Sequence, residues 1–227
     1  MNIKPLMLVI SLATISGHVF GADDLQGYYG SIKLLQAEQS AKNMDLSSRP
    51  SVGSFVRGDE NANFLNGAIA AGYQFANGWR SEGEYVFNKK NEYTSGSTNF
   101  SSSFNHHQID VQRLMLNVYR DYALAHNFSI YGTLGFGVAK IESSGWQGNV
   151  TRQYGANTQN NLVYSVGAGV SYTPLPRLSF DLGYRYVDLG NVDSGYNQFS
   201  NVRGLKDEQM SARITASEVV FATRYLF

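Results

Sequence analysis

The sequence contains no cysteine and only four prolines in 227 residues. The absence of cysteine excludes a disulfide framework and a metal site built on thiolates. No apolar run in the body of the chain approaches the roughly 20 residues that a spanning helix needs, so any membrane crossing would use strands. Lysine plus arginine and aspartate plus glutamate both number 18, a balance that gives no steering toward nucleic acid. No phosphate-binding or metal-ligand motif is present either, so we expect no nucleic-acid partner, no metal and no cofactor.

The N-terminus has the form of a secretory signal. Lys4 supplies a positive charge, residues 5–15 are mostly apolar, and Gly21 offers a small residue for cleavage before Ala22. These features in this order are typical of a signal peptide. We predict that residues 1–21 are removed and that residues 22–227 form one domain. Cleavage after Ala22 is the close alternative.

Aromatic residues are abundant, and the last strand shows how they are arranged. Counting back from Phe227, one face is aromatic and apolar, while the other carries Arg224 and Glu218. A strand alternates its side chains between two faces. A soluble sheet would bury the aromatic face, whereas a transmembrane barrel turns that face to lipid and keeps the charges in its lumen. The pattern therefore favours a barrel.

Eight segments show this alternation, and their connections come in two lengths. The segments are 27–37, 64–76, 79–90, 109–122, 128–141, 162–173, 178–188 and 216–227. Short connections lie at Asn77-Gly78, 123–127 and 174–176, and long ones at 38–63, 91–108, 142–161 and 189–215. Because short and long connections alternate, we predict an all-β fold: an eight-stranded antiparallel up-and-down transmembrane β-barrel with short periplasmic turns and long extracellular loops. Both termini then lie in the periplasm.

Inward positions of these strands carry eight charges. The cations are Lys33, Arg113, Arg185 and Arg224, and the anions are Glu82, Glu84, Asp181 and Glu218. An eight-stranded barrel is only wide enough for its own side chains, and buried charges need partners. One antiparallel register of the last two strands brings Arg185 to Glu218 and Asp181 to Arg224, while Lys33 and Glu84 lie at similar depth. We predict a lumen closed by paired charges; a gated pore is the alternative.

Two strand features refine this prediction. Small inward residues on the fifth and sixth strands leave room for long side chains from the opposite wall; they are Gly135, Gly137, Gly167 and Gly169. The segment 79–90 is the least regular, because Ser81 and Gly83 occupy its outward face. A β-bulge would account for that irregularity.

Several strand segments together resemble a known group. They are Gly27–Gly30 with Lys33, Trp79–Tyr85, Asn117–Tyr119, Val166–Tyr172 and Gly183–Asp188. They resemble the small eight-stranded outer-membrane barrels, which include the opacity proteins, the OmpA and OmpX membrane domains and the enterobacterial adhesin/invasin barrels. The resemblance implies a multi-pass protein of the outer membrane of a Gram-negative bacterium, in contact with lipid and lipopolysaccharide. It also implies that Phe221, Tyr225 and Phe227 form a C-terminal signal for the barrel-assembly machinery.

The long loops are where a partner would bind. Relatives of this kind often act as adhesins, so the resemblance implies cell adhesion and virulence through a host-cell surface glycan or protein. A narrow opacity-type porin and a barrel that stabilises the envelope are the alternatives. Four basic residues, Lys89, Lys90, His106 and His107, flank 91–108; they would form either a rim for phosphates and sulfated glycans or simply solvated charge. Phe100 and Phe104 in the same loop serve either recognition or capping of the rim.

A catalytic role is the remaining class. His106 and His107 lie near Ser101–Ser103 and Asp110 in the sequence. A Ser-His-Asp set needs a nucleophile, a base and an orienting acid in contact, and this spacing follows no known motif. We predict that the protein is not an enzyme.

Overall fold

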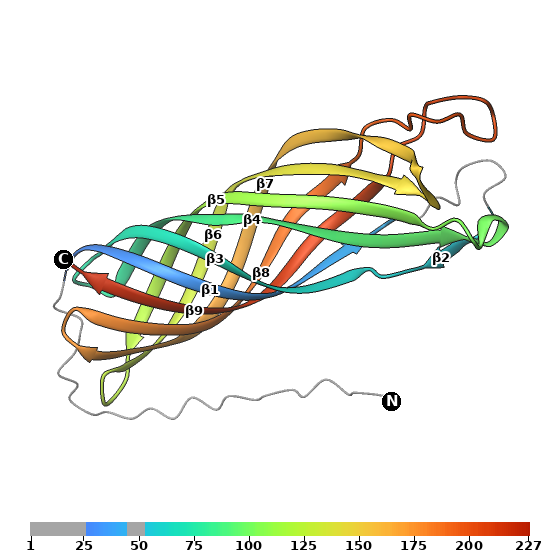
Figure 1. The fold of residues 1–227 in the computed structure, drawn as a ribbon. Helices are drawn as coiled ribbons and strands as arrows, with labels where there is room; N and C mark the ends of the chain where they lie inside the picture. The colour runs from blue at the N-terminus through green and yellow to red at the C-terminus, as the bar shows by residue number, and fades with distance from the viewer. Residues whose placement is uncertain (1–25, 45–52) are drawn as a thin grey trace, which may run out of the picture.

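The computed structural model describes residues 26–44 and 53–227, and the predicted signal peptide at 1–21 lies outside them. Nearly all described residues form one closed antiparallel sheet (Figure 1). Its barrel strands are β1 (Gly27–Lys42), β3 (Asn61–Gln74), β4 (Trp79–Ser97), β5 (Asn105–Ala123), β6 (Phe128–Gln147), β7 (Asn149–Leu175), β8 (Leu178–Asp193) and β9 (Ser211–Leu226). A short strand, β2 (Phe55–Arg57), and a 3-10 turn, η2 (Thr98–Phe100), lie between them. No described helix is long and apolar enough to cross a membrane.

Each barrel strand pairs with the next along the chain, and β1 pairs with β9 to close the sheet. This order confirms the predicted eight-stranded up-and-down fold. The connections after β3, β5 and β7 lie with the C-terminus at one end, which we call the turn end (Figure 1). The connections after β4, β6 and β8 lie at the opposite end, which we call the tip.

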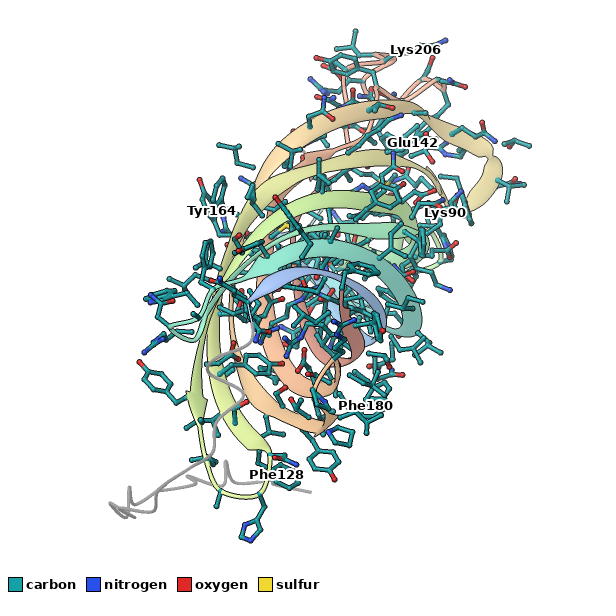
Figure 2. The ribbon with its side chains drawn as sticks, turned by 90° about the vertical axis from the view of Figure 1, so that its left-hand side faces the viewer. Lys90, Phe128, Glu142, Tyr164, Phe180 and Lys206 are labelled. Carbon is teal, nitrogen blue, oxygen red and sulfur yellow. The ribbon has the colours of Figure 1, made fainter. Side chains whose placement is uncertain are left out.

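An apolar belt surrounds the half of the barrel nearer the turn end. Leu34 and Tyr184 are 51% and 55% exposed there, whereas the adjacent Lys33 and Arg185 are 3% and 5% exposed. Tyr164 also projects from the outside of the wall (Figure 2). Exposed aromatic rings gather toward the turn end; they are Trp79, Tyr122, Phe128, Tyr172, Tyr225 and Phe227. Apolar residues outside and polar residues inside are the arrangement of a lipid-facing barrel wall.

The strands run well past their predicted ends at the tip. The predicted loops 91–108 and 142–161 are mostly strand, and β6 and β7 are separated only by Gly148. The predicted loop 189–215 shrinks to the segment between β8 and β9, and the described parts of 38–63 contain β2 and the ends of β1 and β3. The predicted bounds of these loops were therefore too wide, although the long connection between β8 and β9 remains. Beyond the belt the outward side chains meet water, so the apolar-outside signal that identified the strands is lost.

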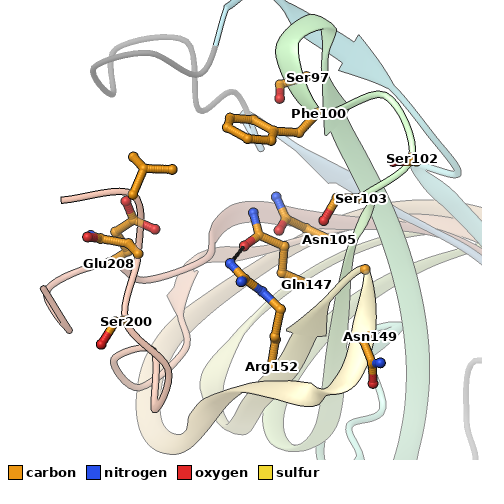
Figure 3. A pocket seen from close by; sticks show the side chains of 13 residues that line it. Ser97, Phe100, Ser102, Ser103, Asn105, Gln147, Asn149, Arg152, Ser200 and Glu208 are labelled. Atoms are coloured by element: carbon orange, nitrogen blue, oxygen red, sulfur yellow. Dashed lines mark hydrogen bonds between the residues drawn. The ribbon is translucent and has the colours of Figure 1, made fainter. Parts of the chain in front are cut away.

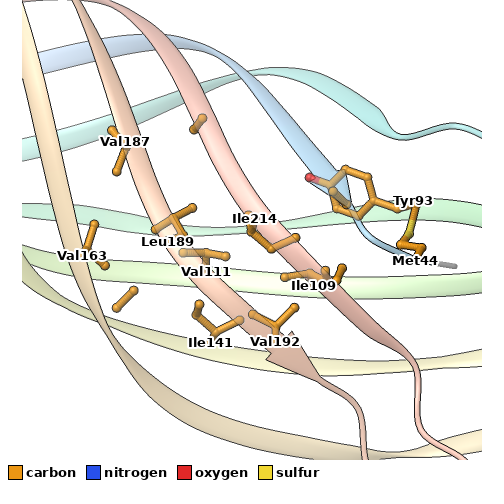
Figure 4. Close-up of a cluster of buried hydrophobic side chains, with 14 of the residues drawn as sticks. Met44, Tyr93, Ile109, Val111, Ile141, Val163, Val187, Leu189, Val192 and Ile214 are labelled. Atoms are coloured by element: carbon orange, nitrogen blue, oxygen red, sulfur yellow. The ribbon is translucent and has the colours of Figure 1, made fainter.

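Beyond the belt the apolar residues move from the outward to the inward positions of the strands. On β5, Leu114 faces outward and is 56% exposed, whereas Ile109 and Val111 face inward and are buried. On β8, Tyr186 faces outward and Leu189 inward. The inward apolar side chains at the tip form one cluster, which we call the tip core (Figure 4). Its members are Ala41, Met44, Tyr93, Ile109, Val111, Met115, Ala139, Ile141, Val163, Val187, Leu189, Val192, Ala212, Ile214 and Ala216.

The β3–β4 pairing is the shortest in the barrel wall. It covers only residues 68–74 of β3. Beyond that point β4 shifts its register against β5 between Val86 and Lys89, within the segment where the sequence suggested a bulge but past Ser81 and Gly83, which pair regularly. A bulge bends its strand and locally disrupts the ladder. The wall is rejoined nearer the tip, where the amide of Thr94 donates a hydrogen bond to the carbonyl of Asp59 at 2.9 Å.

Candidate functional site

Ten charged side chains of the described residues occupy the lumen inside the belt, and we call them the lumen charge network. The structure places all eight charges named from the sequence inside the barrel, and it adds Arg80 and Asp121. The five cations are Lys33, Arg80, Arg113, Arg185 and Arg224, and the five anions are Glu82, Glu84, Asp121, Asp181 and Glu218. Every member has an oppositely charged partner, so the network carries no net formal charge. The inward position of Arg80 could have been read from the outward position of its neighbour Trp79.

Six of these residues form a continuous chain. Its order is Arg113, Glu218, Arg185, Glu84, Lys33 and Glu82. Arg185 lies directly opposite Glu218 in the register of β8 and β9, and its Nε donates to Glu218 Oε2 at 2.6 Å. Its Nη1 lies 2.8 Å from Glu84 Oε1. All six residues are at most 5% exposed, so each depends on the others to offset its desolvation.

The other four charges form a second chain closer to the turn end. Arg80 Nε lies 2.6 Å from Asp121 and its Nη1 lies 3.5 Å from Asp181. Asp181 in turn lies 3.4 Å from Arg224 Nε, diagonally across the β8–β9 pair. The Arg80 guanidinium also lies 4.3 Å from the ring centroid of Tyr119, a favourable cation–π geometry. The hydroxyl of Tyr119 donates to Glu82 at 3.0 Å, which joins the two chains.

Side chains from nearby strands take the space directly beside the small inward glycines of β6, β7 and β8. A Cβ on Gly183 would lie 2.2 Å from the hydroxyl oxygen of Tyr131, and one on Gly135 would lie 2.3 Å from Asn117 Oδ1. Tyr131 belongs to β6 and Asn117 to β5. The opposite wall already supplies the charge network, so the nearer side chains take the space beside the glycines.

The four basic residues predicted at the rim do not come together. His107 is buried inside the barrel with Nε2 2.6 Å from Ser143 Oγ. His106 lies on the outside, where its Nδ1 is 2.8 Å from Glu92 Oε1 and its ring stacks on Trp146. Lys90 faces outward (Figure 2), whereas Lys89 Nζ lies 5.8 Å from the ring centroid of Phe64. Neighbouring residues of a strand point to opposite faces, and this separates each pair.

The same geometry separates the Ser-His-Asp candidates. His107 and Asp110 lie on opposite faces of β5, because an odd number of positions separates them. The hydroxyl that His107 contacts is that of Ser143 on β6, while Ser101–Ser103 lie in the turn after η2. These residues therefore do not assemble the set considered from the sequence.

A hollow of about 480 Å³ opens at the tip, and we call it the tip hollow (Figure 3). Its lining includes Ser97, Phe100, Asn105, Gln147, Arg152 and Glu208. Phe100 stands on one side, Glu208 belongs to the loop on the other side, and Asn105 and Gln147 lie between them. The sequence pointed to Phe100, but it gave no sign that residues 200–208 would face it. Phe104 instead packs toward Gly96 on β4.

His107 lies beneath the tip hollow. A small cavity beside it is lined by Met44, Asn105 and Met210. Burial lowers the pKa of His107 from 6.5 to about 4, and the nearby carboxylate of Asp193 only partly opposes this shift. His107 is therefore neutral at pH 7 and is buried in the lumen as an uncharged side chain.

The sequence and the fold match one family. The outer membrane protein beta-barrel domain matches residues 7–206. The chain belongs to this outer-membrane β-barrel family. The match confirms the family resemblance found in the strands and places the protein in the outer membrane of a Gram-negative bacterium. A search of curated proteins gives no match.

Solved structures of this family share the barrel. Neisserial surface protein A is 16% identical, with a TM-score of 0.52 over 88% of this chain and 97% of that chain. OprG from Pseudomonas aeruginosa is 10% identical, with a TM-score of 0.55 over 88% and 97%. AlkL is 13% identical, with a TM-score of 0.51 over 97% of both chains. At these identities the likeness concerns the fold of these outer-membrane β-barrels and not their activities.

Proposed function

We propose that this outer-membrane β-barrel is an adhesin: a closed barrel that holds the tip outside the cell for contact with another cell surface. The observation that carries this proposal is a group of apolar side chains exposed outside the belt. Phe100, Val150, Tyr196, Val202 and Leu205 lie at the tip and are 37–64% exposed. Exposed apolar side chains that no lipid covers mark surfaces for interaction.

The proposal requires the tip to face outward and both termini to face the periplasm. Short turns of bacterial barrels are periplasmic, and here they share an end with the C-terminus. The C-terminal side chains Phe221, Tyr225 and Phe227 lie on the lipid-facing side of the last strand, where the barrel-assembly machinery would reach them. The belt would contact membrane lipid, and outward charges beyond it, such as Lys90, would contact lipopolysaccharide.

A filled lumen favours a barrel that presents its tip to another surface over a barrel that transports solutes. The lumen charge network occupies the belt half and the tip core occupies the other half. In planar bilayers we expect the purified protein to give no steady porin-sized current. A steady current would instead support the narrow opacity-type porin.

Adhesion can be tested by removing the tip without removing the barrel. The β6–β7 hairpin would be cut back to the Glu142–Thr158 pair and closed with Asn-Gly, and residues 195–209 would be replaced by a short Gly-Ser linker. We expect cells that display this variant to lose most of their adhesion to cultured host cells and to abiotic surfaces, because four of the five exposed apolar side chains are gone and only Phe100 remains. Heat-modifiable gel mobility checks that the barrel assembles. Unchanged adhesion by assembled, displayed protein would reject the proposal.

A point variant separates the apolar side chains from tip length. Tyr196→Ser with Val202→Ser keeps the loop but removes two exposed apolar groups, so adhesion should fall. Lys206→Ser in the same loop is the matched control, because Lys206 is exposed but carries no large apolar surface. Equal adhesion by the double variant and the control would contradict an apolar contact.

A further inference from the structure

We propose that the tip hollow binds a neutral oligosaccharide. This inference rests on the proposed adhesion function and names the class of ligand. A volume of about 480 Å³ falls in the range of small-molecule sites. The lining comes from the β4–β5 connection, the β6–β7 hairpin and the β8–β9 loop, so three separate parts of the tip enclose one site.

A buried amide at the base of the hollow points to a ligand. Asn105 is 3% exposed, and its Oδ1 has no hydrogen-bond partner among residues 26–44 and 53–227. Buried polar atoms in native proteins are nearly always paired. A hydroxyl group would pair with Asn105 in either orientation of the amide, because a hydroxyl both donates and accepts. The ligand is therefore expected to carry hydroxyl groups.

The walls above Asn105 suit a sugar. Ser97, Ser103 and Gln147 supply hydroxyl and amide groups, which make adaptable hydrogen bonds. The ring of Phe100 is 37% exposed on one side of the hollow (Figure 3). A pyranose has an apolar C–H face that packs on such a ring and hydroxyl groups around its edge. This combination of one aromatic wall and many small polar groups matches a sugar better than an apolar peptide.

Charge in the hollow selects a neutral ligand. Arg152 and Glu208 both line it, so an anion would meet Glu208 and a cation would meet Arg152. Arg152 is already held in place: its Nη2 donates to Gln147 Oε1 at 2.8 Å, and its guanidinium lies 4.1 Å from the ring centroid of Phe199. The Arg152 guanidinium is therefore a fixed part of the lining and is not free to bind an anion.

The test is a titration of the purified full-length barrel in nanodiscs, followed by amide chemical shifts. The probes are lactose, N-acetyllactosamine, maltose and chitobiose, with 3′-sialyllactose as the anionic counterpart of lactose. We expect at least one neutral probe to give saturable shifts at 97–105 and 147–152. Asn105→Leu should weaken that binding by about tenfold, the cost of one lost hydrogen bond to a ligand group, and Phe100→Ala should weaken it as well.

Controls keep the outcomes distinct. Asn160→Leu is the matched control, because Asn160 is exposed on the outside of β7 away from the hollow, and it should bind like wild type. The inference is overturned if no neutral probe saturates, if Asn105→Leu and Phe100→Ala both bind like wild type, or if sialyllactose binds more tightly than lactose. The adhesion proposal is judged separately by the tip-truncated cells. If truncation abolishes adhesion but no sugar binds, the sugar inference is rejected and the adhesion proposal stands.

Discussion

Inside the belt the lumen is filled by ions, whereas at the tip the same strands enclose apolar side chains. In the belt half, residues such as Arg185 and Glu84 are buried and paired. In the tip half, Ile109, Ile141 and Leu189 are each 0% exposed. The outer surface reverses in step, since the belt is apolar outside and the tip is mostly polar outside.

The difference shows that the surroundings of a strand decide what its inner face contains. Lipid takes the apolar side in the belt, so inward residues are polar and must satisfy one another. Water surrounds the tip, so the hydrophobic effect drives the apolar side inward there. The two halves should consequently respond to different changes: the belt half to loss of charge, and the tip half to loss of volume and to acid.

The largest effect is expected from breaking the charge chain at its centre. Arg185→Met leaves Glu84 and Glu218 short of a cation in a buried site, which should lower the free energy of unfolding by about 3–5 kcal/mol. Urea unfolding in phospholipid vesicles measures this change. Adding Glu218→Gln should recover part of the loss, because it removes one of the stranded carboxylates. A cost below about 1 kcal/mol for Arg185→Met would mean that the belt half does not depend on ion pairing.

The second-largest loss of stability is expected from a cavity in the tip core. Leu189→Ala removes a buried side chain and should cost about 2–5 kcal/mol. Hydrogen exchange should show faster exchange in the tip parts of β5, β6 and β8, with belt amides unchanged. Leu182→Ala on the same strand is the matched control, because Leu182 faces lipid and is 50% exposed. Equal acceleration of belt and tip would show that the halves unfold as one unit.

Acid should weaken the tip selectively. The pKa of His107 is about 4 in the folded protein and 6.5 ordinarily, so the unfolded form takes up the proton first as the pH falls. The contribution of His107 to the free energy of unfolding is complete above pH 6.5. It is lost between pH 6.5 and 4, by about 3 kcal/mol in all. Hydrogen exchange at the tip, compared at pH 7 and 4.5, measures it. His107→Gln retains an amide near Ser143 but cannot titrate, and its tip should lack this part of the pH dependence.

The smallest effect is a steric one in the belt half. Gly183→Ala would place a Cβ 2.2 Å from the Tyr131 hydroxyl and should cost about 1–3 kcal/mol by overpacking. Tyr131→Phe removes that oxygen and should rescue much of the loss. It should not rescue Gly169→Ala, whose Cβ would also lie 2.5 Å from Tyr131 Cζ. The measurement is the temperature at which the heat-modifiable gel mobility changes. It is compared for Gly183→Ala and Gly169→Ala, each with and without Tyr131→Phe.

The belt half could be predicted from sequence because its outward face carries a strong apolar signal. That signal located the barrel strands, and the charges then lay on their inward faces, including the Arg185–Glu218 pair. The tip parts of the strands were not predicted, because residues 142–161, which include Glu142 and Ser143, are mostly polar at both inward and outward positions. On β5 a clue was present: Ile109 and Val111 are out of phase with Leu114, and this change of phase marks the end of the belt. The tip hollow could not be predicted, since residues 97–105 and 200–208 meet only through the tertiary fold.

The uneven pairing of the wall has a mechanical consequence. β1 is joined to β9 from Tyr29 to Lys42, whereas β3 is joined to β4 only over residues 68–74 of β3. A lateral load on a sheet is shared among the backbone bonds of each ladder, so the shortest ladder yields first. A cell held by these tips under shear would therefore strain each barrel first between β3 and β4, while the longer ladder between the two ends of the chain would still hold.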